Sequence, residues 1–466
     1  MKKRTVKILK IIAVILIVLS LLYAIAVGVS AAKLNRVYAD LRKDGRPMNQ
    51  ADVIPKIVPD TENAALLYES AALLLKAQPA PEGNLPEYLG AGSSEMGPKP
   101  TLEANLLEYL GGLSDKFIKE SLDPDKLAEL QKLIEQDIVT QALSIVEQGT
   151  QRPSCWFDRD YKDGIYTLLP NVPNLRELSH ILSAKARIEG RAGNLDKAWN
   201  MVRTQFRLAD ATRNEPIIVP QLVRIVITKL ACRTVQELCA IAVPNEQQYR
   251  SIQEFLTSFD DITPIVRAID GERLLLGEWA FNLPKKELYK VTMEQDQQGD
   301  IPDIIYKLII LRTTFKPLFL ADRAAYMRFM HKSAQYIENP HSHDRVDTLE
   351  RQVEEQHHML TKILSPAISR VKVMHNEMIA EVRVTQVGLA LLQHKQRQDA
   401  FPDTLEALKP QNINDPFSEQ PIRYKAQGQG FILYSIGRDK KDNNGSPRQN
   451  KQENDWDIVW SYTGGR

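Results

Sequence analysis

The chain has 466 residues, with 60 Lys and Arg against 59 Asp and Glu and a formal net charge of +1. A chain of this length forms about two to four domains. A net charge so close to zero argues against nucleic acid as a main partner. Three cysteines are too few for a scaffold built on disulfides.

The first feature along the chain is a run without charged residues at 11–32. At about 1.5 Å per residue, a helix of this length can cross a hydrocarbon core of about 30 Å. Basic residues without any acid precede the run, namely Lys2, Lys3, Arg4, Lys7 and Lys10. Because positive charge stays on the cytoplasmic side, this pattern predicts a cytoplasmic tail at 1–10 and a single-pass anchor at 11–32, with the bulk of the chain outside.

A cleaved signal peptide is the alternative interpretation of this run, since Val29-Ser30-Ala31 resembles a small-residue cleavage site. The apolar run is longer than the usual core of about 7–15 residues in a signal peptide. We therefore favour an uncleaved anchor, followed by a juxtamembrane linker at 33–60.

The middle of the chain, at 61–375, is expected to be a helical domain because apolar residues recur there at three- and four-residue spacing. A Pro- and Gly-rich loop is expected at 79–100. Helices are predicted from 61 onward and at 102–113, 125–135, 137–148, 175–189, 195–212, 219–241, 246–258, 263–281, 304–338 and 345–398, the last one broken near Pro366. We expect an irregular, solenoid-like array of paired helices that bury their apolar faces on their neighbours.

The clearest unit in this array is a predicted helical hairpin with its turn at 190–193. The following Gly-Asn-Leu-Asp-Lys-Ala-Trp at 193–199 resembles the turn between the two helices of a tetratricopeptide unit. No second copy follows at the period of about 34 residues that such repeats require. A regular repeat array is therefore not expected.

Titratable residues in the helical part suggest little chemistry. Glu354 and His358 have the spacing of one helical turn and could hold zinc with a third ligand, but we expect them, like His375, to be solvated surface residues. Asp260-Asp261 precede a helix start and fit a capping role. The sequence contains no nucleophile elbow, no phosphate-binding glycine loop and no CxxC pair. We therefore predict no catalytic residue and a protein that is not an enzyme.

The tail of the chain carries ordered turn and strand signals. Pro402 disfavours helical dihedrals at Phe401 and so ends the preceding helix, and Asp415-Pro416 is typical of a turn. Short strands are predicted at 421–425, 430–436 and 457–460, with a hairpin turn at 427–430 and a polar loop at 438–454. This order predicts a short antiparallel sheet after the last helix.

The tail also resembles the C-terminal half of the major pseudopilins of type II secretion and of the wider type IV pilin-like group. The residues that carry the likeness are Phe401-Pro402, Leu405, Leu408, Asp415-Pro416-Phe417, Tyr424, Tyr434-Ser435, Gly437, Asp439, Asp457-Ile458 and Trp460. The resemblance implies that residues 376–466 form a helix with a small α/β cap. The chain departs from the family at Lys440, where a glycine is usual. It also departs in the several hundred residues between membrane helix and tail, which argues against a fibre subunit.

In that family, the loop before the last strand holds a calcium ion. The resemblance therefore implies candidate ligands at Asp439, Asp455 and Asp457, with Asp442 and Asn444 as neighbours. Calcium takes about six to eight oxygen ligands, which a carboxylate-rich loop can supply. The alternative is a solvated polar loop in which Asp and Asn serve as ordinary turn residues.

These observations together predict a mainly α protein of the bacterial inner membrane, anchored by one helix. We expect a non-enzymatic interaction or assembly protein, related to secretion or pilus-like machinery, that binds protein partners and no nucleic acid. Calcium is the only candidate cofactor, and it depends on the resemblance of the tail. The alternative function is an exported hydrolase whose site lies in the helical domain.

Overall fold

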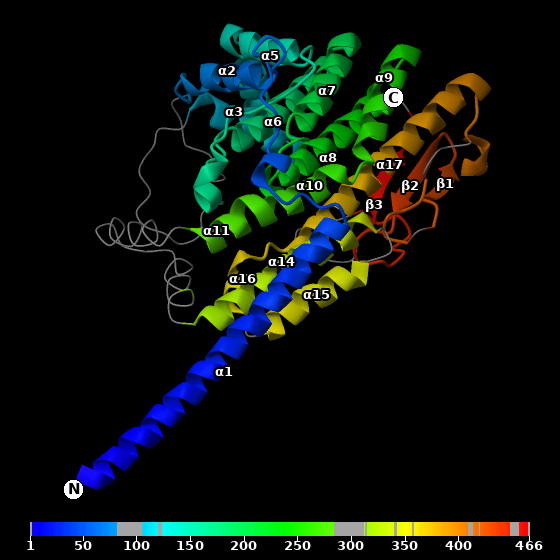
Figure 1. Cartoon of the computed structure of the whole chain (residues 1–466). Coiled ribbons are helices and arrows are strands. Elements are labelled where there is room, and N and C mark those ends of the chain that lie inside the picture. The colour runs from blue at the N-terminus through cyan, green and yellow to red at the C-terminus, as the bar shows by residue number, and fades with distance from the viewer. Residues whose placement is uncertain are drawn as a thin grey trace. The chain divides into compact units, whose positions relative to one another are not determined.

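The computed structural model in Figure 1 is mainly helical, with a short three-stranded antiparallel sheet near the C-terminus. The structure describes residues 2–81, 105–119, 124–283, 312, 315–339, 343–356, 358–408, 413–418, 420–447 and 456–464. The chain divides into two compact units. Unit 1 comprises Met1–Ile54, Asp160–Thr167 and Ile265–Ser369, and unit 2 comprises Pro55–Arg159, Leu168–Pro264 and Arg370–Arg466. The domain boundaries predicted from the sequence stay a prediction.

Unit 1 is built on two long helices and several short elements. It contains α1 (Lys2–Lys43), η1 (Gln50–Asp52), η3 (Tyr161–Tyr166), most of α10 (Thr263–Gly271), η4 (Glu272–Gly277), α11 (Glu278–Asn282), α14 (Lys316–Glu338), α15 (His343–Glu355) and α16 (Met359–Leu364). The carboxylate of Asp322 on α14 accepts hydrogen bonds from the backbone N–H groups of Leu360 (2.9 Å) and Thr361 (2.8 Å). These bonds satisfy free N–H groups at the start of α16 and hold it against α14.

Helix α1 has two parts with different surroundings. In the first part apolar side chains are exposed, for example Leu16 (58%) and Ile25 (61%). In the last turns, Leu34, Val37 and Leu41 are buried. Helix α1 is long and apolar enough to cross a membrane, as a membrane anchor or a signal sequence would be. The prediction of one long apolar helix near the N-terminus is confirmed.

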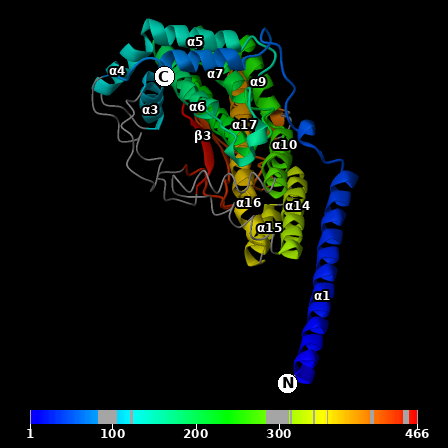
Figure 2. The same cartoon turned by 60° about the vertical axis from the view of Figure 1, so that its left-hand side comes forward.

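The C-terminal part of α1 lies beside α14, and both helices run in the same direction (Figures 1 and 2). Arg323 Nε of α14 donates a hydrogen bond to the Tyr38 hydroxyl oxygen at 3.1 Å. Further along, His331 Nε2 of α14 lies 2.8 Å from a carboxylate oxygen of Asp44. The sequence separation is 285 residues for the first pair and 287 for the second, so the partners advance together along two parallel helices.

Unit 2 contains the remaining helices. They are α2 (Ala65–Lys76), α3 (Leu106–Lys119), α4 (Pro124–Ile134), α5 (Asp137–Gly149), α6 (Asn171–Arg191), α7 (Leu195–Asp210), α8 (Ile218–Ile241), α9 (Glu246–Phe259) and all but the first residues of α17 (Ile368–Gln398). Their bounds follow the predicted ranges within a few residues. At α9 the reason is local: Asn245 and Gln248 form a capping box, which satisfies N–H groups at the helix start.

The predicted helix range at 345–398 was wrong in detail. The stretch at 345–398 breaks near Pro366 as expected, but it also breaks between α15 and α16.

Helices α6 and α7 form the expected pair, with Gly193 at φ +82° in the turn between them. Only glycine adopts such a φ without steric cost, so this residue allows the close turn.

The tail folds into η5 (Leu405–Leu408) and the strands β1 (Arg423–Gln427), β2 (Gly430–Ser435) and β3 (Ile458–Tyr462), in the sheet order β1-β2-β3. Both strand pairs are antiparallel, with Leu433 of β2 paired to Tyr424 of β1 and to Trp460 of β3. The predicted strands and the hairpin turn are confirmed, and Gly428 takes a φ of +56° in that turn. The Trp460 ring packs on α17 at Gly388, where a Cβ atom would overlap it.

Asp415 connects the turn after η5 with the end of β2, and it is fully buried. Its carboxylate accepts hydrogen bonds from Phe417 N (2.9 Å), Ser435 Oγ (2.8 Å) and Ile436 N (2.8 Å). A buried carboxylate is tolerated only when such donors replace its water. Asp415 therefore holds the turn at 415–417 against the end of β2.

Candidate functional site

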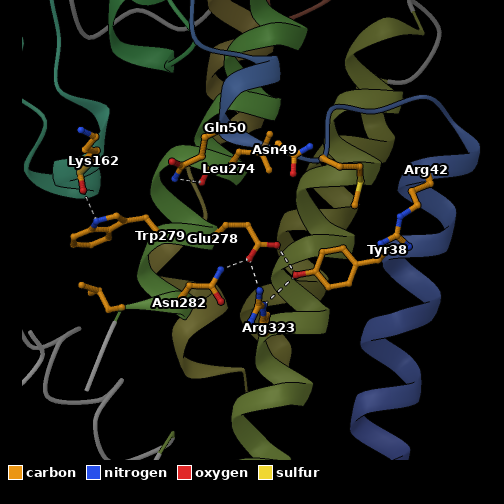
Figure 3. A pocket seen from close by; sticks show the side chains of 12 residues that line it. Tyr38, Arg42, Asn49, Gln50, Lys162, Leu274, Glu278, Trp279, Asn282 and Arg323 are labelled. Atoms are coloured by element: carbon orange, nitrogen blue, oxygen red, sulfur yellow. Dashed lines mark hydrogen bonds and ion pairs between the residues drawn. The ribbon is translucent and has the colours of Figure 1, made fainter. Parts of the chain in front are cut away.

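Unit 1 contains a cavity of about 700 Å³ beside the C-terminal part of α1, drawn in Figure 3. Its walls come from α1, the segment around η1, η3, η4, α11 and α14. We call it the α1 pocket. Because these segments lie far apart in the sequence, no local motif signals the pocket.

A partly buried charged group lies at the centre of the α1 pocket. The Glu278 carboxylate accepts hydrogen bonds from the Tyr38 hydroxyl, the Arg323 guanidinium and Asn282 Nδ2, the last at 3.1 Å (Figure 3). The Glu278 and Arg323 side chains are only 13% and 18% exposed. An ion pair with additional hydrogen bonds holds a definite geometry, so this group fixes α1, α11 and α14 to one another.

The opposite wall of the pocket is formed by Trp279, which is half-buried. Its Nε1 donates a hydrogen bond to the Lys162 carbonyl at 2.8 Å, and the Tyr166 ring meets it edge-on at 6.0 Å between centroids. Gly164 has a φ of +56°, and a Cβ atom there would overlap the Trp279 ring. Glycine at this position therefore lets the backbone of η3 approach the indole.

The floor of the α1 pocket includes a π-helix, η4, between α10 and α11. Such segments are rare and occur frequently at functional sites. The Leu274 carbonyl accepts a hydrogen bond from Gln50 Nε2 at 3.3 Å, and a Cβ atom at Gly277 would overlap the Tyr326 ring. The apolar spacing at 263–281 predicted one regular helix here and gave no signal for the π-helix.

Two cations lie at the edge of the α1 pocket, Arg42 and Lys162, and both are exposed. Neither forms an ion pair with another residue in the described part of the chain. With the half-buried Trp279 indole and the amides of Asn49 and Gln50, they form a lining suited to a ligand with an anionic group and a flat or apolar portion. A ligand of this kind fits the pocket chemistry best.

A second cavity, of about 900 Å³, lies in unit 2 between α3, α6 and α8. His180 Nε2 is 3.7 Å from an oxygen of Asp115, and His180 Nδ1 is 3.7 Å from an oxygen of Glu177. Burial raises the pKa of Glu177, but His180 and Arg176 outweigh it and the net shift is downward, so Glu177 stays ionised. This acid–histidine–acid group was missed, since its members come from two separate helices.

A third polar group is buried around α17, where His375 is only 4% exposed. The prediction that His375 is a solvated surface residue is wrong, because neighbouring segments of unit 2 cover this part of α17, with Arg224 of α8 close to it. Burial lowers the pKa of His375 to about 3, and the charges of Arg224, Lys372 and Arg383 act in the same direction. Burial also lowers the pKa of Lys372 to about 8.

The buried His375 predicts an acid-sensitive fold. The unfolded chain takes up a proton near pH 6.5, whereas the folded chain does so only near pH 3. Between these values the unfolded state binds more protons, so stability is full above pH 6.5 and falls by up to about 1.4 kcal/mol per unit as the pH drops. We expect His375→Leu to flatten this slope in urea unfolding of the full chain in detergent. The same change at His394, which is partly exposed on α17, is the control, and equal slopes in both variants would contradict the prediction.

The predicted calcium ligands lie in the loop before β3, and Asp455 lies outside the described residues. Asp457 is buried, and its carboxylate accepts hydrogen bonds from the N–H groups of Asn443 (3.3 Å) and Gly445 (2.7 Å). Asp439 accepts a hydrogen bond from Asn443 Nδ2 at 2.9 Å. These bonds close the loop on itself.

The other two predicted residues point to the sheet and the loop backbone. Asp442 pairs with Arg423 at 2.7 Å and accepts a hydrogen bond from the Tyr434 hydroxyl at 3.0 Å. Asn444 has a φ of +59° and donates its N–H to Asp442 at 2.9 Å. Within the described ranges, no three or more His, Cys, Asp or Glu side chains converge to hold a metal ion. The calcium site stays a prediction.

Other residues singled out in the sequence have ordinary positions. Glu354 and His358 were expected on one helix, but α15 ends at Glu355 and α16 begins only at Met359. The predicted one-turn spacing of the two side chains is therefore wrong. Asp261 accepts a hydrogen bond from Thr263 N at 2.9 Å at the start of α10, which confirms the capping role for this residue. Asp260 instead pairs with Arg383 at 2.7 Å.

Comparison with protein-family models, with curated proteins and with solved structures gives no match for this chain.

Proposed function

We propose that this chain is a single-pass, membrane-anchored and non-enzymatic interaction or assembly protein of the bacterial envelope. The observation that carries the proposal is α1, whose first part exposes apolar side chains while its last turns are packed into unit 1. Exposing an apolar helix of this length to water costs free energy, whereas the hydrocarbon core of a bilayer would cover its apolar side chains.

The continuity of α1 favours an anchor over a cleaved signal. Ser30 is 9% exposed and Leu34 is 7% exposed, so the packed part of the helix begins at the site that resembles a cleavage sequence. A protease needs an extended segment, and unwinding this one would expose those residues and break helical hydrogen bonds. The basic residues before the span favour a cytoplasmic N-terminus, with the bulk on the outer side of the inner membrane.

A role in binding is supported by the α1 pocket. Tyr38 and Arg42 follow the end of the apolar run at Ala32 by six and ten residues, or about 9 and 15 Å along the helix. The pocket therefore lies close to the membrane surface, where an envelope protein meets its partners. Its lining of two exposed cations and a half-buried indole suits recognition of a charged partner group.

A relation to secretion or pilus-like machinery is part of the same proposal. It is supported by the order of helix, turn and three strands in the tail, by the buried Asp415 and by Trp460 on Gly388. These residues coincide with the motif that resembles the pseudopilin tail. In the proposal, the tail is a docking module and not a fibre subunit.

The anchor is tested by extraction of native envelopes with alkaline carbonate, followed by N-terminal sequencing of the protein. We expect the protein in the membrane pellet with an intact first segment. A soluble chain that begins near residue 32 would refute the anchor. Crosslinking in intact envelopes with mass spectrometry then tests the interaction role, which fails if no partner is recovered.

Calcium binding by the tail loop is tested by thermal unfolding of the full-length protein in detergent, with calcium and with a chelator. Asp457 is the predicted ligand at the loop closure, so we expect a calcium-dependent rise in melting temperature that Asp457→Asn abolishes. The exposed Asp403→Asn is the control. An identical melting temperature with calcium and with chelator would remove calcium from the proposal.

A second function, an exported hydrolase, is favoured by the group of Asp115, Glu177 and His180 in the unit 2 cavity. A histidine between two carboxylates can act as a general base towards water. Turnover of chromogenic ester or glycoside substrates that is lost in His180→Ala and kept in His394→Ala would support it. Absence of turnover by the unaltered protein would exclude this alternative for those substrate classes.

A further inference from the structure

The register between α1 and α14 places the start of α14 at a definite height on α1. Arg323 bonds to Tyr38, and His331 bonds to Asp44, at sequence separations of 285 and 287. Since both helices run in the same direction with the same rise, separations of 285 to 287 put Phe315 level with residues 28–30 and Leu318 level with residues 31–33. The start of α14 is therefore level with the end of the apolar run.

The residues at this height have the composition of a membrane interface. Phe315 is 47% exposed and Leu318 is 58% exposed. The neighbouring Lys33, Arg36 and Lys316 are also exposed. Large apolar side chains beside lysine and arginine are typical of a surface that lies at the boundary between acyl chains and headgroups. In water, the two apolar side chains would be left uncovered next to each other.

We propose that unit 1 rests on the bilayer at this height, with Phe315 and Leu318 immersed in the interface and the three cations among the headgroups. The inference depends on the proposed anchor, since α1 must span the membrane for this face to reach it. The occupant of the apolar face is then the lipid surface itself. This seating would hold the α1 pocket at a constant distance from the headgroups.

The proposal is tested with single cysteines that carry an environment-sensitive fluorophore. Leu318→Cys is compared with Arg328→Cys, which is exposed on the same helix about 15 Å further from the proposed surface. Both are made in a Cys155→Ser background, because burial protects the thiols of Cys232 and Cys239 from labelling. The full chain is placed in nanodiscs that contain lipids with a quenching group near the headgroup.

We expect quenching at residue 318 to be at least about twice that at residue 328, because only residue 318 lies within the interfacial layer. Equal quenching at both positions, or none at residue 318, would overturn the seating of unit 1. A third label at Ile17→Cys separates this failure from that of the anchor. If Ile17 is quenched by lipids labelled deep in the acyl chains and residue 318 is not, only the present inference fails. If Ile17 is not quenched, the proposed anchor fails.

Discussion

Asp415→Ala is expected to destabilise the C-terminal region by about 3–5 kcal/mol, because it removes the acceptor of three buried hydrogen bonds. The substitution leaves the donors Phe417 N, Ser435 Oγ and Ile436 N without an acceptor in a site that water does not reach. Each buried and unsatisfied donor costs about 1–3 kcal/mol. The turn after η5 would then separate from the end of β2.

The measurement is urea unfolding of the full-length protein in detergent, followed by tryptophan fluorescence because Trp456 and Trp460 are buried in this region. Asp415→Asn should give a smaller loss of stability, since the amide keeps one acceptor oxygen. Its N–H₂ group replaces the second oxygen and cannot accept the remaining hydrogen bond. Asp403→Ala removes an exposed acid near the same turn and should change stability by less than about 0.5 kcal/mol. A similar effect of the changes at 403 and 415 would refute the role of Asp415.

Glu278→Ala is expected to cost about 3 kcal/mol, because Arg323 would be left as a partly buried cation without its carboxylate. The Tyr38 hydroxyl and Asn282 Nδ2 would lose the same acceptor. Since these residues join α1, α11 and α14, the loss should appear as lower thermal stability of unit 1 and as a loosened contact between α1 and the rest of that unit.

A double variant separates two effects of Glu278→Ala, the loss of the ion pair and the burial of an unpaired Arg323. Glu278→Ala with Arg323→Met removes both charges, and we expect it to be less destabilised than Glu278→Ala alone. The control is the exposed Arg250, which pairs with Glu246 at 2.9 Å, and Arg250→Ala should cost at most about 0.5 kcal/mol. If the double variant loses as much unfolding free energy as the sum of the two single variants, Glu278 and Arg323 are not coupled as described.

Local signals predicted much of the fold. The apolar spacing along the chain indicated most helices, and turn residues such as those around Gly428 indicated the hairpin of the tail. These features arise from interactions between residues only a few positions apart. The break after Glu355 and the π-helix at η4 were not predicted, because packing against other segments decides them.

The candidate site was less accessible to sequence reasoning. The resemblance of the tail pointed to Asp442 and Asp457. In the structure Asp442 accepts a hydrogen bond from the Tyr434 hydroxyl, and Asp457 accepts one from Gly445 N in the loop. Nothing in the local sequence around Glu278 or His180 distinguishes them from other surface residues. Only their neighbours in space, on segments far away in the chain, make them candidates.

By itself the sequence determined the long apolar helix at the start, the helical character of the middle, and the strands and hairpin of the tail. Each depends on periodicity and turn chemistry within a short window. Only the tertiary structure decided that Tyr38, Glu278 and Arg323 meet in a pocket, that His375 is buried, and that Phe315 lies level with the end of the apolar run. These facts depend on how distant segments pack, and packing is a property of the whole fold.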